Sequence, residues 1–402
     1  MHGVENITIT ILMRWKMKKG VIAAAIGAAF TYCAGLAHAA DPGLKEWVPV
    51  APSRVASECG LDPELLKEAD RKMGNNPYAV VRYGKLCHEY RNTTGVYHVA
   101  SITKLAASLT VGIATTKTRL SDESPVTDYL YWWEMHSINR QAKVAHILAM
   151  TSTKRDLSWG DKGNWYYDAF GWREIDKLIP IVRRALADEP KAFPGVSSMA
   201  KLARTQLFEK IGMQNTSWAG LTTAYSMFSN VRDMARLGLL VLRKGMWNGK
   251  RILSEEYVYR MGHPAFPDTN TGYGYLFMMN ARDNWKYSSG SNDPDCAPVS
   301  LWNEYPHRPF YEAKHCNGGN PTCSQQYDVG TKWAAGAGGQ KVVIHPGLDL
   351  VMVVRDDWTN EGHNNVWKAV RPALVKLDPA FAGDEASFCQ AYKNNAYAPD
   401  LR

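Results

Sequence analysis

Ser101 and Lys104 stand three residues apart within HVASITKLAASLTVGIA, residues 98–114. Leu105 and Leu109 follow at helical spacing, which predicts a short turn leading into a buried helix. A serine at the start of such a helix lies near unpaired main-chain N–H groups, which stabilise a developing oxyanion. A partly desolvated lysine one turn later, on the same face, can accept the serine proton at neutral pH. The pair therefore has the chemistry of Ser–Lys acyl transfer.

The same spacing occurs again at Ser198 and Lys201. A two-letter pattern of this kind arises by chance roughly once or twice in a chain of this length. Polar and apolar residues alternate over 198–208 as in a surface helix, so we interpret this second copy as structural. For Ser101, the competing interpretation is an ordinary helix N-cap.

The composition allows a large buried core. The chain has 402 residues, of which 45% are hydrophobic, and a net charge of +8. Several of the basic residues lie together at positions 14–19. No basic cluster interleaved with aromatic residues follows later in the sequence, which argues against nucleic acid as a partner.

Residues 13–40 have the pattern of a secretory signal: a basic start, an apolar stretch at 21–36 and the small-residue cleavage site AHA. Translation could then begin at Met13 or Met17. A transmembrane anchor is the alternative, but the apolar stretch is short for a span. We expect residues 1–40 to be removed, leaving 41–402 as a single domain without a stable membrane anchor, periplasmic or secreted by a bacterium.

The cysteines fit this expectation. Cys33 lies in the signal, and an even number remains, which predicts disulfides in an exported chain without defining their pairing. Cys316 and Cys323 are close enough to close a small loop, and their spacing does not fit a zinc ribbon. The remaining cysteines are Cys59, Cys87, Cys296, Cys316, Cys323 and Cys389.

Strand patterns lie at both ends of the region after residue 41, with helical patterns between them. This order predicts an α+β protein whose sheet joins the two termini and carries a helical lobe at about 115–260. Residues 283–329 show little periodicity and three cysteines, which indicates a disulfide-stapled excursion near the mouth of the site. The expected strands are 77–83, 86–90, 273–279, 340–344 and 350–355, and the expected helices include 63–73, 144–150, 173–187, 228–242 and 366–377.

The order of short motifs from residue 77 onward resembles the penicillin-recognising serine hydrolases, which include class C β-lactamases. The resemblance is greatest to the 6-aminohexanoate-dimer hydrolase and family VIII esterase type. It implies a β-lactamase-like fold with Ser101 as nucleophile. The motifs are the Ser–Lys helix with VGIA at 111–114, LAMTS at 148–152, LFEKIGM at 207–213, VRDMARLG at 231–238, WNGKRIL at 247–253 and GAGGQ at 336–340.

The family's second motif supplies a tyrosine that shares proton transfer with the lysine, and it falls here within WYYDAFGW, residues 165–172. Aligning the Gly–aromatic pair that follows selects Tyr167, with Ala169 where the family often has asparagine. A shift of one selects Tyr166 instead, with Asp168 in the third place. The ring that is not catalytic would then serve in aromatic core packing.

The family's third motif, Lys-Thr-Gly or His-x-Gly, corresponds here to WAAGAGG at 333–339, which has neither lysine nor histidine. Its glycines still permit close backbone approach, so the N–H of Ala337 can join that of Ser101 in an oxyanion hole. We expect Gly336 and Gly338 to contact substrate, together with Tyr166 and Asp168. Without a lysine or histidine here, the motif has no cation to bind a substrate carboxylate. This argues against β-lactams and favours an ester or amide that lacks the family's usual anionic group.

The resemblance thus predicts a serine hydrolase that forms an acyl-enzyme on Ser101, with Lys104 and Tyr167 moving protons, on a small-molecule ester or amide. No cofactor is expected, and the histidines show no metal-ligand spacing. Two alternatives stay open. The protein could be a non-catalytic or weak penicillin-binding-like protein that recognises cell-wall peptides, or it could be a β-lactamase.

Overall fold

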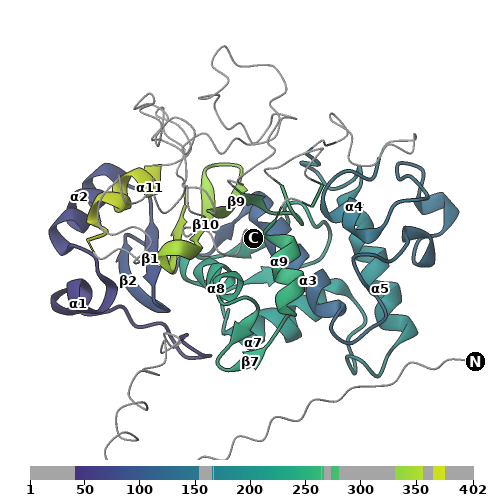
Figure 1. Ribbon diagram of the computed structural model, residues 1–402, viewed down its shortest axis with the longest axis horizontal. Helices are drawn as coiled ribbons and strands as arrows, with labels where there is room; N and C mark the ends of the chain where they lie inside the picture. Colours follow the sequence, from purple (N-terminus) through teal and green to yellow (C-terminus); the bar gives the residue numbers. More distant parts are fainter. Residues whose placement is uncertain are drawn as a thin grey trace, which may run out of the picture. The chain divides into compact units, whose positions relative to one another are not determined.

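The computed structural model describes residues 41–153, 165, 167–263, 265–266, 273–279, 331–355 and 365–375 (Figure 1). The predicted signal at 1–40 with Cys33, the predicted excursion at 283–329 and Tyr166 lie outside these residues. Four of the six cysteines expected in the mature chain also lie outside them: Cys296, Cys316, Cys323 and Cys389. The expected domain division therefore stays a prediction. None of the described helices is both long and apolar enough to cross a membrane.

A six-stranded antiparallel sheet joins distant parts of the chain in the order β2-β1-β11-β10-β9-β8. Its first two strands come from near residue 80 and its next three from beyond residue 331, which confirms the predicted α+β sheet. The register places Ala79 opposite Val353 and Val342 opposite Val353 on the other side. The strands are β1 (Tyr78–Arg82), β2 (Lys85–Tyr90), β8 (Met278–Met279), β9 (Lys332–Gly336), β10 (Gln340–His345) and β11 (Leu350–Val354).

Helices cover both faces of this sheet. On one face lies α8 (Val231–Leu242), where Gly238 leaves space for Val342 and Val351 to approach its backbone. On the other face, α11 (Asn365–Val370) stacks Trp367 on His345 and packs against α2 (Pro63–Met73). The alternation of side chains along β10 therefore separates two apolar layers.

The remaining helices include α3, which carries Lys104 and packs against α5, α6 and α9. Small strands form two further sheets, one of which joins β3, β5 and β4. The bounds are α1 (Val55–Cys59), α3 (Thr103–Ala114), α4 (Val144–Leu148), α5 (Leu178–Asp188), α6 (Met199–Leu202), a π-helical segment (Ala203–Phe208), α7 (Glu209–Ile211), α9 (Glu255–Met261), β3 (Tyr97–His98), β4 (Ser217–Trp218), β5 (Met227–Ser229), β6 (Met246–Trp247) and β7 (Lys250–Arg251).

Some expected boundaries are wrong. The helix expected from Phe228 begins only at Val231, because Phe228 pairs with His98 in a strand and Asn230 caps the helix through the amide of Asp233. The closing helix ends at Val370, since the following Arg371–Ala373 turn contains a proline that cannot continue it.

The strand expected at 273–279 is mostly a tight turn. The Gly274 amide donates to the carbonyl oxygen of Phe277 at 2.9 Å, and only Met278–Met279 pairs with β9. A side chain at Gly274 would lie 2.2 Å from the carbonyl oxygen of Met261, so close packing requires glycine at this bend.

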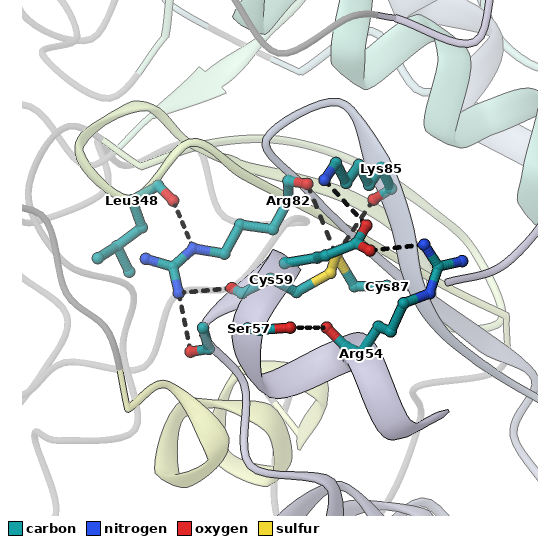
Figure 2. The surroundings of a disulfide bond; sticks show 9 residues. Arg54, Ser57, Cys59, Arg82, Lys85, Cys87 and Leu348 are labelled. Carbon is teal, nitrogen blue, oxygen red and sulfur yellow. Dashed lines mark hydrogen bonds and ion pairs between the residues drawn. A yellow bond between two sulfur atoms is a disulfide. The ribbon is translucent and has the colours of Figure 1, made fainter. Parts of the chain in front are cut away.

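A disulfide joins Cys59, at the end of α1, to Cys87 in β2 (Figure 2). For these two cysteines it confirms the prediction of disulfides, which did not define the pairing. Arg82 lies buried beside it and donates to the carbonyl oxygens of Cys59, Gly60 and Leu348 at 3.0–3.1 Å. The guanidinium thereby satisfies three carbonyl groups from two segments, the end of α1 and the 3-10 turn that contains Leu348.

Replacing both Cys59 and Cys87 with alanine should lower the free energy of unfolding by about 3 kcal/mol, because the unfolded chain gains the freedom that the crosslink removes. Urea unfolding without reductant measures the change. Ser57→Ala, at an exposed site on α1, is the control and should change stability by less than about 0.5 kcal/mol. Equal stabilities of the double variant and the wild type would contradict the prediction.

Candidate active site

A strained turn presents Ser101. Ala100 has φ +47°, in the left-handed region that non-glycine residues seldom adopt. It is the first residue of the 3-10 turn Ala100–Ile102, which lies between β3 and α3. Thr103 holds this turn: its hydroxyl donates to the carbonyl oxygen of Ala100 at 2.7 Å and accepts from the Met227 amide at 3.0 Å. All three residues of this turn are buried, and Ser101 is 9% exposed.

Lys104 lies one turn into the helix and is 2% exposed. Its Nζ lies 3.3 Å from the Ser101 Oγ and donates to the carbonyl oxygen of Ala224 at 3.1 Å. The amine also lies 4.8 Å from the centre of the Tyr167 ring. The predicted Ser–Lys pair is therefore assembled, with Tyr167 beside it.

Burial lowers the pKa of Lys104 to about 7, although the carboxylates of Asp168 and Asp176 oppose this change. A lysine amine with this pKa is largely uncharged slightly above neutral pH. It can then accept the proton of the hydroxyl 3.3 Å away, which an ordinary ammonium cannot do.

Tyr167 keeps its proton. Burial raises the pKa of its phenol to about 12, while a hydrogen bond with Ser101 acts in the opposite direction. A neutral phenol beside the serine and the lysine can donate a proton and recover one from the amine. Tyr167 thus lies beside the Ser–Lys pair. Tyr166 lies outside the described residues, so the choice of Tyr167 as the catalytic tyrosine stays a prediction.

The end of β9 approaches the serine turn closely. A Cβ atom at Gly336 would lie 2.4 Å from the carbonyl oxygen of Val99 and 3.3 Å from the Ala100 Cβ. Ala337 and Ser101 follow these contacting residues directly in the chain. Within the described part of the chain, neither the Ser101 nor the Ala337 amide donates a hydrogen bond, as expected for two donors left available to an oxyanion.

The turn after β9 depends on Gly338 and Gly339, which have φ of +87° and +89°. Gln340 supports this turn from the first position of β10, because its side-chain amide donates to the carbonyl oxygens of Gly336 and Ala337. The turn that carries the Ala337 amide is therefore fixed from within the sheet.

Asp168 is buried and serves the loop that carries Tyr167. Its carboxylate accepts from the amides of Gly171, Glu174 and Ile175 at 2.8–3.1 Å. The residue also lines a cavity of about 490 Å³ next to Tyr167. Both oxygens of Asp168 thus accept main-chain hydrogen bonds, and contact of this residue with substrate stays a prediction.

Several solved structures share the arrangement of this chain. A protein from Bacteroides dorei DSM 17855 assigned as a β-lactamase superposes with a TM-score of 0.54 at 11% identity, covering 81% of this chain and 99% of its own. A β-lactamase from Mycobacterium bovis gives 0.50 at 14% identity, covering 80% and 98%. One from Sulfitobacter sp. EE-36 gives 0.50 at 16% identity, covering 77% and 98%.

The chain has the β-lactamase fold. This confirms the fold that the sequence resemblance implied. No protein-family model matches the sequence, and a comparison with curated proteins finds no match. In this fold, Ser101 and Lys104 come from the 3-10 turn and the first turn of α3, Tyr167 comes from a loop, and Ala337 follows the last residue of β9.

Sequence reasoning missed three supports of the site: the carbonyl group of Ala224, the hydroxyl of Thr103 and the carboxylate of Asp176. Acidic residues in the aromatic segment after Tyr167 were a usable signal, because carboxylates seldom occur in apolar surroundings without partners. The second Ser–Lys pair is confirmed as structural, since Ser198 caps α6 by accepting from the Lys201 amide. No group of three or more metal-ligating side chains occurs among the described residues.

Glu174 is fully buried, and its carboxyl accepts hydrogen bonds from the amide and hydroxyl of Ser152. Burial raises the pKa of Glu174 to about 8, so the folded protein retains a proton that the unfolded chain releases near pH 4.5. Stability contributed by this group is therefore present at low pH and declines as the pH rises from about 4.5 to about 8.

Glu174→Gln should remove this decline, because the amide does not titrate. The stability of the wild type relative to the variant should fall between pH 5 and pH 8.5, by at most about 5 kcal/mol. Urea unfolding across this range measures it. A constant difference between the two proteins would show that Glu174 has an ordinary pKa.

Proposed function

We propose that this protein is a serine hydrolase that cleaves an ester or amide bond through an acyl-enzyme on Ser101. The observation that carries the proposal is the buried Lys104 amine, which lies 3.3 Å from the serine hydroxyl and has its pKa lowered to about 7. The fold supports the general kind of chemistry, because the similar structures from Mycobacterium bovis and Sulfitobacter sp. EE-36 are β-lactamases.

The reaction follows from these groups. Neutral Lys104 takes the hydroxyl proton while the Ser101 Oγ bonds to the substrate carbonyl carbon, whose oxygen becomes an oxyanion held by the Ser101 and Ala337 amides. The oxyanion collapses and breaks the bond to the leaving alcohol or amine. Tyr167 protonates that group and recovers a proton from Lys104. Water then attacks the acyl-enzyme by the same route and releases the acid.

The substrate we propose is a neutral ester or amide. Residues 333–339, which form β9 after Lys332 and the turn that follows it, include no cationic side chain that could bind a substrate carboxylate. The β-lactamases among the similar structures make β-lactam turnover the second candidate. Hydrolysis of nitrocefin tests that candidate directly.

We also propose that the protein acts in the periplasm or outside the cell. The signal-like pattern at 13–40 and the Cys59–Cys87 disulfide support this location, because such bonds persist in oxidising compartments.

Ser101→Ala should abolish labelling by a fluorophosphonate probe and release of nitrophenol from p-nitrophenyl acetate and butyrate. The wild type should show both. Ser198→Ala is the matched control, because this serine has the same spacing to a lysine but its hydroxyl caps α6 by accepting from the Lys201 amide. A folded wild type without either activity would contradict the hydrolase and leave a binding protein for cell-wall peptides.

Gly336→Ala should lower kcat/KM by about 100-fold, since the new methyl group would push β9 away from the serine turn and separate the two amide donors. Esterase kinetics and a melting curve measure the effect on activity and on folding. Gly195→Ala is the control for activity: a Cβ at this exposed glycine contacts nothing within 4 Å, but its φ of +74° strains alanine. This variant should therefore lower the melting temperature and leave kcat/KM unchanged. Unchanged kinetics for Gly336→Ala would contradict the placement of the oxyanion site.

A further inference from the structure

We propose that Asp176 is a positioning residue that fastens the loop carrying Tyr167 to the loop carrying Ala224, and so holds both against Lys104. The inference rests on the proposed hydrolase function and adds to it a residue without which the proton-transfer groups lose their alignment. Asp176 lies in the short 3-10 turn Ile175–Lys177, directly before α5.

One oxygen of Asp176 accepts three hydrogen bonds from the second loop. The donors are the hydroxyl of Thr222 at 2.8 Å, the hydroxyl of Thr223 at 2.8 Å and the Thr223 amide at 2.7 Å. These residues lie more than 40 positions later in the chain, so this contact ties two segments that are distant in sequence. Hydrogen bonds to a carboxylate are stronger than those between neutral groups.

Asp176 is also bound to its own loop. Its amide donates to the Gly171 carbonyl oxygen at 2.9 Å, and a Cβ at Gly171 would lie 2.4 Å from the Asp176 Oδ1. The loop from Tyr167 therefore folds back on the carboxylate, and only glycine, here at φ +87°, permits that approach.

The second loop continues the connection to Lys104. The Thr222 hydroxyl accepts from the Ala224 amide at 3.0 Å, and the Ala224 carbonyl oxygen accepts from the Lys104 Nζ at 3.1 Å. The carboxylate is thus connected through Thr222 and Ala224 to the catalytic amine. Since Tyr167 lies on the first loop, one side chain aligns two neighbours of that amine.

Charge provides a second, separable effect. Within the described residues, the groups around Lys104 are the Ser101 hydroxyl, the Ala224 carbonyl, the neutral phenol of Tyr167 and the carboxylates of Asp168 and Asp176. Both carboxylates raise the pKa of Lys104 against the effect of burial. Removing the charge of Asp176 should therefore lower the pKa of Lys104. The amine would then lose its proton at a lower pH but would be a weaker base.

Three variants separate alignment from charge. Asp176→Asn keeps an oxygen that can accept the same hydrogen bonds but removes the charge. The double variant Thr222→Val, Thr223→Val keeps the charge but removes two donors. Asp176→Ala removes both. Asp188→Asn, at an exposed position at the end of α5, is the matched control.

The acid limb of kcat/KM should have its midpoint near pH 7 in the wild type. We expect Asp176→Asn to move this midpoint down by at least about 0.5 pH unit with kcat within about threefold. The threonine double variant should lower kcat about tenfold without moving the midpoint, and Asp176→Ala should lower kcat about 50-fold. The control should match the wild type. The proposal is overturned if Asp176→Ala folds and retains kcat within threefold.

Two measurements do not require turnover and keep a failure of the hydrolase proposal distinct from a failure of this one. Hydrogen exchange at the Thr223 amide should accelerate at least about tenfold in Asp176→Ala, because its acceptor is lost. The titration of Lys104, followed by the ¹³Cε lysine signal that is missing in Lys104→Met, should move to lower pH in Asp176→Asn. Unchanged exchange and titration would overturn the role of Asp176 whether or not any ester is hydrolysed.

Discussion

The removal of one amine from water is the interaction on which this site depends. Lys104 is 2% exposed and, among the described residues, forms no ion pair. Its direct partners are a hydroxyl and a carbonyl oxygen, which satisfy its protons without favouring the charged form as strongly as a carboxylate in contact would. The two carboxylates that influence it are bound elsewhere, Asp168 to main-chain amides and Asp176 to threonines. The result is an amine with a pKa of about 7.

Close packing of small residues then brings the sheet to this amine. The backbone of Gly336 lies against Val99 and Ala100, so the end of β9 reaches the serine turn without an intervening side chain. The left-handed conformation of Ala100 turns the chain sharply into α3. Strain at this turn is compatible with folding because Thr103 and the neighbouring strand β5 hold it from both sides. The position of the Ala337 amide relative to Ser101 thus depends on the absence of side-chain atoms at one strand end.

Local patterns in the sequence were sufficient to predict the parts of the molecule that depend on neighbouring residues. The spacing of Ser101 and Lys104 on a buried helix and the alternation in β1 and β2 each require information from only a short stretch. The resemblance to known hydrolases added Tyr167 and Ala337. The carbonyl of Ala224 and the carboxylate of Asp176 could not be predicted in this way. Their roles arise from contacts between segments 46 to 120 positions apart, which no periodicity encodes.

Other differences have the same origin. Phe228 fits a helical pattern, but pairing with His98 decides its conformation. Tyr273 to Met279 has the apolar composition of a strand, but Gly274 must pass close to the Met261 carbonyl and the chain turns there. In both cases a tertiary contact overrides a preference that the local sequence expresses correctly.

The central pairing of the sheet also determines how the protein can fold. Ala79 in β1 lies opposite Val353 in β11, so one edge of the first hairpin has no partner until the last strands have been synthesised. During that interval the apolar strand Tyr78–Arg82 presents an open edge, which in a nascent chain invites pairing with other molecules. Contacts over such sequence separations also form slowly. Productive folding of this protein therefore depends on keeping the β1–β2 hairpin from aggregating until the β10–β11 hairpin is available to pair with it.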